Sequence, residues 1–173
     1  MAQPIASGSQ WHSSEAITTW SVSCLQALGL TAADAQLLAQ SLVQTCLWGI
    51  DSHGIGKLPH YMERFVRGSI KTQPEVRVVP SGPSTAQVFG DRGHGILVAH
   101  QAMALARQLA ADTGVGVVGV TDSSHCGAMA LYARPAAQAG MIAFAFTHSD
   151  SMAAPFGGTR AFFGTNPICI AIP

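Results

Sequence analysis

The sequence predicts an α/β fold in which an N-terminal helical region, residues 1–75, precedes a sheet-containing domain, residues 76–173. Apolar residues recur at helical spacing as far as Gly68, and short extended runs begin after it. Beyond that point helices alternate with apolar, near-continuous strands, which is typical of a mixed sheet that is at least partly parallel. With 48% hydrophobic residues in 173 positions, the chain can bury a sizeable core.

Composition limits the classes of function. Lys+Arg and Asp+Glu both number 9, and no basic cluster stands out, which argues against a nucleic-acid surface. No apolar run reaches transmembrane length, and Met1–Gln10 lacks the form of a signal peptide, so we expect a cytoplasmic protein without a membrane partner. Cys24, Cys46, Cys126 and Cys169 have no CxxC spacing, which suits reduced thiols. The charged fraction of only 10% indicates that some surface is buried in an oligomer.

Three helices are expected in the first region. Ser13 or Ser14 caps the first, and Gly29 ends it. The next begins after Thr31, which forms a capping-box pattern with Asp34 in place of the usual Glu. The second and third helices are expected over residues 32–49 and 58–67.

The second region should contain strands, turns and helices in alternation. Two short extended runs, 76–79 and 87–89, are separated by a loop at 80–83. Residues 90–95 are expected to form a turn. Helices are then expected at 96–111 and 128–139, buried strands at 115–120 and 141–146, and a last strand at 168–172.

Gly114, Gly116 and Gly119 match the GxGxxG pattern of dinucleotide-binding proteins. That fingerprint requires a strand before the glycines and a helix that opens at them. Here a helix comes before them, and they lie among β-branched valines, which are poor residues for a helix start. We therefore reject the Rossmann interpretation.

The segment Asp51-Ser52-His53-Gly54 lies between two predicted helix ends. An imidazole titrates near neutral pH, so His53 can give or take a proton, and the neighbouring Ser52 hydroxyl can fix its tautomer or relay the proton. Lys57 follows four residues later and could hold a carboxylate, on the same side as His53 if the helix begins near Gly54. The alternative is a helix cap with a merely polar surface histidine.

A second histidine segment runs from Thr121 to Met129, where a strand ends and a helix begins. Ligands collect at the carboxyl ends of strands in α/β sheets, and a helix N-terminus offers backbone N–H groups to a phosphate. The next strand also ends in a polar, histidine-containing loop, residues 147–151, so we expect two adjacent strands to point at one site. The alternative is a histidine that only caps its loop.

Three motifs occur together in order: Asp51-Ser52-His53-Gly54, then Ser124-His125-Cys126-Gly127 with Tyr132, and Gly164-Thr165-Asn166-Pro167. In these the chain resembles the malate/L-lactate dehydrogenase family, which also holds L-sulfolactate and ureidoglycolate dehydrogenases and cyclic-ketimine reductases. The resemblance implies a non-Rossmann NAD(P)-binding fold and a homodimer. Family members are about twice as long, so we expect the NAD(P)-binding domain to be incomplete in this chain and the isolated chain to be inactive. The other half is expected to be either a separate C-terminal chain or a part of the protein that lies outside this sequence.

The resemblance also implies roles for residues. His53 matches the proton donor or acceptor of the ketimine reductases, with Ser52 as its relay partner, whereas other members give that role to the histidine matching His125. Thr165 matches a substrate contact, and Lys57 stands where the family usually has a substrate-binding arginine. Lysine keeps the charge but lacks the planar fork of arginine. The cofactor contacts implied are His125, Cys126, Gly127, Ala128, Met129 and Ser149.

The function implied is hydride transfer between NAD(P)H and a small 2-oxo acid or 2-hydroxy acid. Reduction of cyclic imines such as Δ1-piperideine- or pyrroline-2-carboxylate is the nearest alternative, and Gly127 and Tyr132 follow the hydroxy-acid members better. A non-catalytic binding or assembly domain is a third interpretation. A zinc hydrolase is disfavoured because the histidines lack HExxH spacing. The sequence does not choose between NAD and NADP or identify the 2-oxo acid.

Overall fold

The computed structural model describes residues 11–173 and begins with the expected helices. They are α1 (Ser14–Ala27), α2 (Ala32–Leu47) and α3 (Leu58–Val66). Ser13 is the cap of α1, with its hydroxyl accepting from the Ala16 N–H at 3.1 Å. Thr31 caps α2 by accepting from the Asp34 N–H at 3.1 Å.

The first ten residues, expected to be frayed, lie outside the described residues. Within residues 11–173, no helix is both long and apolar enough to cross a membrane.

The connection from α2 to α3 differs from the expected helix start. It consists of two short 3-10 turns, Asp51–His53 and Ile55–Lys57, with extended backbone at Gly54 between them. We expected Lys57 to lie on the same side as His53 if an α-helix began near Gly54. That condition is not met, because α3 begins only at Leu58.

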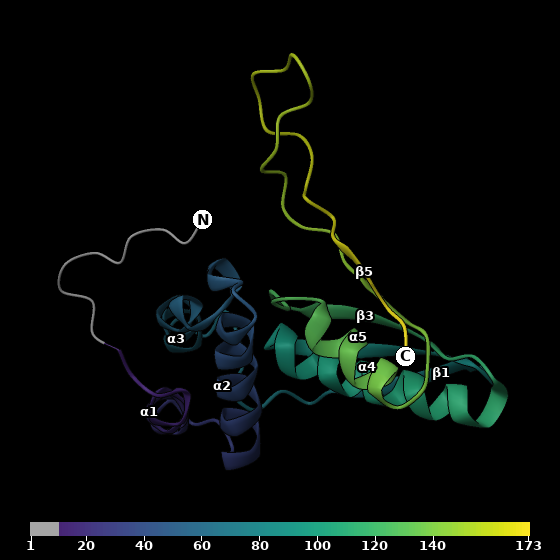
Figure 1. Ribbon diagram of the computed structural model, residues 1–173, viewed down its shortest axis with the longest axis horizontal. Coiled ribbons are helices and arrows are strands. Elements are labelled where there is room, and N and C mark those ends of the chain that lie inside the picture. Colours follow the sequence, from purple (N-terminus) through teal and green to yellow (C-terminus); the bar gives the residue numbers. More distant parts are fainter. Residues whose placement is uncertain (1–10) are drawn as a thin grey trace.

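A three-stranded sheet follows, made of β1 (Arg77–Gly82), β2 (Thr85–Gly93) and β3 (Val117–Ser123) in that order. β1 and β2 are antiparallel, and β2 and β3 are parallel, so the expected mixed sheet is confirmed. Helix α4 (Gly95–Thr113) connects β2 to β3. Figure 1 shows α1, α2 and α3 on one side of the molecule and the sheet with α4 and α5 on the other.

Two turn predictions were wrong in extent. β1 and β2 continue almost to their hairpin tip, through residues 80–82 that were expected to be loop. β2 also runs through residues 90–93, expected to be a turn, although Asp91 and Arg92 have φ of 47° and 57°. The pairing of β2 with β3 shifts register between Phe89 and Gly93, so this is an irregular strand end rather than a free turn.

The glycine pattern rejected above proves to be structural. Gly114 caps the C-terminus of α4 in the left-handed conformation, with φ of 86°. Gly119 lies inside β3, paired with Gln87 of β2. No helix opens at these glycines, because the helix that they adjoin precedes them.

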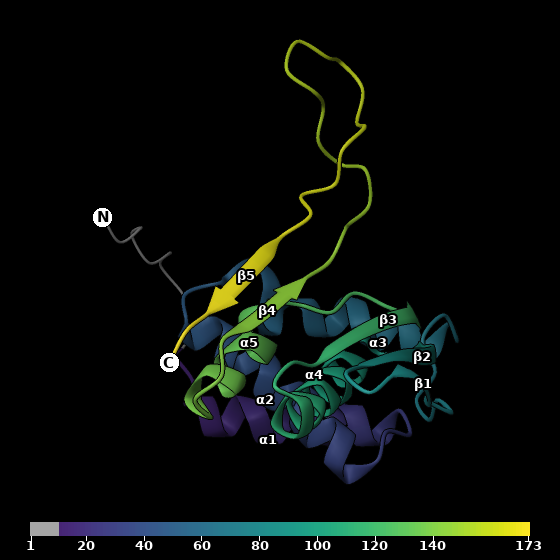
Figure 2. The ribbon, with the colours of Figure 1, turned by 90° about the vertical axis from the view of Figure 1, so that its right-hand side faces the viewer.

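The remaining elements are α5 (Ala130–Gln138), β4 (Ala143–Phe146) and β5 (Ile168–Ala171). β4 and β5 form a separate antiparallel pair, so the expectation that β3 and β4 are adjacent strands was wrong. Figure 2 shows β4 and β5 side by side, with the chain between them, the arm (residues 147–167), extending away from the body. The arm is almost entirely exposed.

The core is divided between the helices and the strands. One cluster joins the three N-terminal helices to Ile96 and Leu97 of α4. A second lies between α5 and the β4–β5 pair. β3 was expected to be buried but is mostly exposed, because it is an edge strand whose second face nothing in residues 11–173 covers. The outer face of the β4–β5 pair is apolar and likewise exposed, through Phe144, Phe146, Ile168 and Ile170.

Candidate active site

The structure brings together two histidines that are 72 positions apart in the sequence, His53 and His125. Their ring centroids lie 5.4 Å apart with the planes tilted by 31°. His53 comes from the first 3-10 turn, and His125 comes from the loop between β3 and α5. The Ser52 hydroxyl lies 2.9 Å from Nδ1 of His53, which is the contact expected of a relay or tautomer-fixing partner. We call His53 and His125 the imidazole pair.

Close backbone packing at two glycines holds the loops of the imidazole pair in place. A Cβ at Gly54, next to His53, would overlap the Cys46 sulfur of α2. A Cβ at Gly95, the first residue of α4, would overlap the Ser124 carbonyl oxygen and lie 2.7 Å from the His125 carbonyl carbon. The Gly95 N–H also donates to the Ser124 hydroxyl at 3.0 Å. The start of α4 is therefore fitted directly against the His125 loop.

Gly95→Ala is expected to lower the free energy of unfolding by about 1–3 kcal/mol, the usual cost of overpacking. The added methyl group meets backbone atoms of the His125 loop, which cannot move aside as a flexible side chain could. Urea denaturation would measure the change. Gly56→Ala is the matched control, because a Cβ there meets nothing within 4 Å. Equal midpoints for the Gly95 variant and the wild type would contradict the close fit.

Tyr61 and His94 complete the cluster, and sequence reasoning assigned neither to it. The Tyr61 hydroxyl lies 2.6 Å from Nδ1 of His125. His94 is fully buried and packs edge-on against the Tyr61 ring, with centroids 4.3 Å apart. Tyr61 lies on the buried side of α3 and is 1% exposed, as an ordinary core residue would be. The only signal in the sequence was its position two turns after the His53 segment, which does not reveal a contact with His125.

The surroundings favour the neutral forms of His125 and Tyr61. Partial burial lowers the pKa of His125, and the nearby basic groups, His53 first and then Lys57, lower it further. Burial raises the pKa of Tyr61 to about 12, so its phenol keeps its proton at neutral pH. The cluster therefore places a His125 ring that favours its neutral form beside the His53 ring.

His94 makes the stability of the fold sensitive to acid. Burial, with smaller contributions from His125 and Arg64, lowers its pKa from 6.5 to about 3. Between these values the unfolded chain binds a proton that the folded chain does not, so the free energy of unfolding falls as the pH falls. The slope from this group is about 1.4 kcal/mol per pH unit.

His94→Asn is expected to reduce the slope of the free energy of unfolding against pH by the contribution of about one proton. The asparagine side chain can still accept the hydrogen bond that Nδ1 of His94 accepts from the Ile96 N–H at 3.2 Å, so the α4 cap is retained. Urea denaturation at a series of pH values between 6.5 and 3 would measure both slopes. An unchanged slope in the variant would show that His94 is not the acid-sensitive group.

Lys57 is a partly buried cation at the end of the second 3-10 turn. It is close enough to His125 to lower the pKa of that imidazole. The salt bridges found within residues 11–173 join Arg67 to Glu63 and Lys71 to Asp91. Lys57 thus has no carboxylate partner in the described part of the chain. Its ammonium can therefore donate hydrogen bonds to the carboxylate of a ligand.

The predicted cofactor segment, His125 to Met129, leads from the end of β3 to the first turn of α5. Gly127 has φ of 67°, a conformation that favours glycine. The Tyr132 hydroxyl donates to the Cys126 carbonyl and so fixes the loop to α5. Thr147, at the end of β4, lies against the Cys126 thiol, whose pKa is raised by burial. The loop after β3 and the end of β4 therefore meet here, although the two strands belong to different sheets.

Ser149 and Thr165 form a second polar cluster. Ser149 lies near the start of the arm and Thr165 near its end in sequence, and the two meet where the arm leaves and rejoins the β4–β5 pair. Their hydroxyls lie 3.1 Å apart, and the Thr165 N–H donates to the Ser149 oxygen at 2.9 Å. Asn166 joins them by accepting from the Ser149 N–H. No hydrogen bond within residues 11–173 connects this cluster to the imidazole pair. The structure therefore unites the predicted site residues into two groups rather than one.

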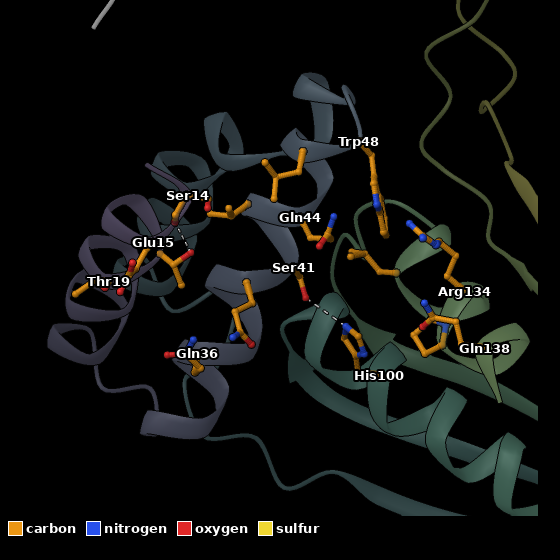
Figure 3. A pocket seen from close by; sticks show the side chains of 16 residues that line it. Ser14, Glu15, Thr19, Gln36, Ser41, Gln44, Trp48, His100, Arg134 and Gln138 are labelled. Atoms are coloured by element: carbon orange, nitrogen blue, oxygen red, sulfur yellow. Dashed lines mark hydrogen bonds between the residues drawn. The ribbon is translucent and has the colours of Figure 1, made fainter. Parts of the chain in front are cut away.

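An open groove lies elsewhere in the described part of the chain. It has a volume of about 740 Å³ and lies between α1 and α2 on one side and α4 and α5 on the other. Figure 3 shows Ser41 of α2 reaching across it to His100 of α4, with a contact of 3.2 Å. Its lining includes none of the residues predicted for the site, and the imidazole pair lies outside it. Among residues 11–173, no three His, Cys, Asp or Glu side chains are grouped as a metal ion would require.

Comparison with known proteins yields a family match over nearly the whole chain. The model of the family described as malate/L-lactate dehydrogenase matches residues 12–173. Malate dehydrogenase from Pyrococcus horikoshii is 40% identical over 152 residues, which cover 88% of this chain and 42% of that protein. Its solved structure superimposes with a TM-score of 0.89 at 38% identity, covering 92% of this chain and 46% of that one.

One further relative and one further solved structure carry other names. Ureidoglycolate dehydrogenase (NAD(+)) from Escherichia coli is 37% identical over 145 residues, which cover 84% of this chain and 42% of that protein. The structure of Δ1-piperideine-2-carboxylate reductase from Pseudomonas syringae has a TM-score of 0.85 at 24% identity, covering 95% of this chain and 50% of that one, and so shows a shared fold alone. The chain spans about half the length of the relatives that it matches.

Proposed function

This chain belongs to the malate/L-lactate dehydrogenase family, and on that premise we propose that the whole protein reduces a small 2-oxo acid to the 2-hydroxy acid with NAD(P)H. A hydride is added to C2, a proton is added to the C2 oxygen, and the reverse reaction oxidises the hydroxy acid. The observation that carries the proposal is the imidazole pair beside Lys57, a partly buried cation without a carboxylate partner among the described residues. A 2-oxo acid requires both of these groups, a proton source for its carbonyl and a positive charge for its carboxylate.

The chain's own residues would act as follows. Lys57 binds the substrate carboxylate and so holds the C2 carbonyl near the imidazole pair. His53, with Ser52 at its Nδ1, gives a proton to the C2 oxygen as the hydride arrives, and Ser52 keeps the ring oriented. His125 lies within 5.4 Å of His53, ring centre to ring centre, and can hydrogen-bond to the same oxygen. Thr165 is proposed as a further substrate contact from the arm.

The residues of the β3–α5 loop suit a nicotinamide cofactor. The loop is partly open to solvent, is held by Tyr132, and precedes an α-helix, so its backbone N–H groups and small side chains are available to a planar ring and its phosphates. We propose that His125, Cys126, Gly127, Ala128 and Met129 contact the cofactor, with Ser149 from the arm. When bound, NAD or NADP supplies the hydride, and the protein supplies position and charge.

The organisation of the whole protein is also part of the proposal. We propose a helical region, residues 1–75, and the first part of an NAD(P)-binding domain, residues 76–173, in a cytoplasmic homodimer. The exposed apolar face of the β4–β5 pair supports burial of this surface in the whole protein. It could be covered by residues outside this sequence, which include a separate C-terminal chain, or by a second copy of the protein.

Absorbance at 340 nm tests the activity. The whole protein is expected to oxidise NADH or NADPH when 2-oxo acids such as oxaloacetate and pyruvate are supplied. Turnover with Δ1-piperideine-2-carboxylate but with none of the 2-oxo acids would assign the imine reaction instead. No oxidation with any substrate of either class would favour a non-catalytic binding role.

A further inference from the structure

The Tyr61 hydroxyl is the one side-chain group seen to hydrogen-bond a ring nitrogen of His125 in the described part of the chain. We infer that Tyr61 is a positioning residue that holds His125 in the tautomer with its proton on Nε2, so that His125 offers an N–H to the substrate oxygen. This inference rests on the proposed function for its catalytic meaning. The tautomer itself is a property of the folded protein and can be measured without substrate.

The direction of the hydrogen bond follows from burial. Tyr61 is 1% exposed, and Nδ1 of His125, at 2.6 Å, is the partner that the structure gives to its hydroxyl. A buried O–H that donates to nothing is costly, so the phenol donates to Nδ1. The raised pKa of Tyr61, about 12, agrees with a phenol that keeps its proton. An Nδ1 that accepts a hydrogen bond carries no proton, which leaves the proton of the neutral ring on Nε2.

The packing around Tyr61 keeps its hydroxyl aimed at His125. The His94 ring meets the Tyr61 ring at 88° with centroids 4.3 Å apart, and His94 is itself fixed as the cap of α4. Phe65, one turn along α3, also stacks on the His94 ring, with centroids 5.8 Å apart. Tyr61 therefore cannot turn away from Nδ1 without disturbing a fully buried ring. The two nitrogens lie on opposite sides of an imidazole, so Nε2 of His125 faces away from Tyr61.

The charged groups around His125 act in the same direction as the phenol. His53 and Lys57 approach from the 3-10 turns, His60 and Arg64 from α3, and all four disfavour a positive charge on His125. His94, beyond Tyr61, also interacts with it, and the neighbouring Cys126 thiol has a pKa raised by burial. A hydrogen bond from Tyr61 stabilises the neutral ring further. In the Nε2–H tautomer, His125 then serves as a neutral hydrogen-bond donor while His53 remains free to transfer the proton.

Nitrogen-15 NMR of the whole protein, without substrate or cofactor, tests the inference. In the wild type, Nδ1 of His125 is expected to be unprotonated and Nε2 protonated near neutral pH. Tyr61→Phe should add the Nδ1–H tautomer and raise the pKa of His125 in a titration. The inference is overturned if Nδ1 of His125 is protonated in the wild type. It is also overturned if His125 has the same tautomer and the same titration in Tyr61→Phe as in the wild type.

Tyr132→Phe is the matched control, because it removes a phenol that donates to the backbone of the same loop at Cys126. It is expected to keep the His125 tautomer, even if the fold is less stable. In turnover, Tyr61→Phe should lower kcat roughly 2- to 13-fold, the range for one neutral hydrogen bond, with cofactor affinity unchanged. A protein with the expected tautomer but no dehydrogenase activity would retain the structural inference and refute the proposed function.

Discussion

His53→Ala in the whole protein is expected to lower kcat for 2-oxo acid reduction by at least roughly 100-fold, the usual loss for a general acid. His53 lies in a short 3-10 turn with Ser52 at Nδ1, so its other nitrogen is the one available to the substrate. Alanine removes this proton source and leaves the sequence of the β3–α5 loop, the proposed cofactor contact, unchanged. Cofactor affinity, measured by NADH fluorescence, is expected to change little.

His60→Ala is the control for this experiment. His60 is an exposed histidine at the start of α3, and its loss should leave kcat close to the wild-type value. If His53→Ala also turned over at the wild-type rate, His53 would have only a structural role. The proton would then have to come through His125, and His125→Ala would be the variant that abolishes turnover.

Lys57→Met is expected to raise KM for the oxo acid by roughly 10- to 150-fold, because a hydrogen bond to a charged group contributes roughly 1.5–3 kcal/mol. The Lys57 ammonium has no carboxylate partner within residues 11–173, so the substrate would be its first. Methionine has a similar length and lacks the charge. Steady-state kinetics with varied oxo acid at saturating cofactor would measure the change, and the affinity for NAD(P)H should be unaffected.

The other lysine of the chain provides the control. Lys71 bonds Asp91 at 2.6 Å, so Lys71→Met should affect stability rather than KM. Lys57→Arg should retain most activity, since a guanidinium can hold both carboxylate oxygens. An unchanged KM in Lys57→Met would leave the substrate carboxylate without this partner and direct the search to residues outside this chain.

The helical region was predictable because its signals are local. Ser13 and Thr31 cap helices by bonds to backbone three residues away, and Gly29 follows the end of α1 with φ of 96°. Such contacts involve neighbouring residues, so they are visible in the sequence itself. The short 3-10 turns around Gly54 were missed because they depend on Gly54 packing against Cys46 of α2, a contact made in three dimensions.

The strands were harder to predict because pairing is a long-range property. Residues 90–93 have the composition of a turn, yet pairing of Gly93 with Ser123 keeps them in β2. β3 and β4 both begin with apolar residues, and nothing local shows that they belong to different sheets. The exposed β3 follows from its place at the edge of the sheet, which no property of its own residues reveals.

The candidate site was predicted in its parts but not in its assembly. The two histidine segments were recognised by residue type, and the structure places their rings 5.4 Å apart. Tyr61 was missed because a tyrosine on the apolar face of a helix is also an ordinary core residue. Its contact with His125 spans 64 positions of sequence and depends on how α3 packs against the β3–α5 loop.

Transfer of deuterium is the most direct test of the proposed chemistry. The whole protein would be given a 2-oxo acid and a reduced nicotinamide cofactor carrying two deuterium atoms at C4 of the ring, and the product would be analysed by mass spectrometry. The account predicts a 2-hydroxy acid with one deuterium on C2, because the hydride passes directly from the cofactor to that carbon. A 2-hydroxy acid without deuterium on C2, or no 2-hydroxy acid at all, would contradict it.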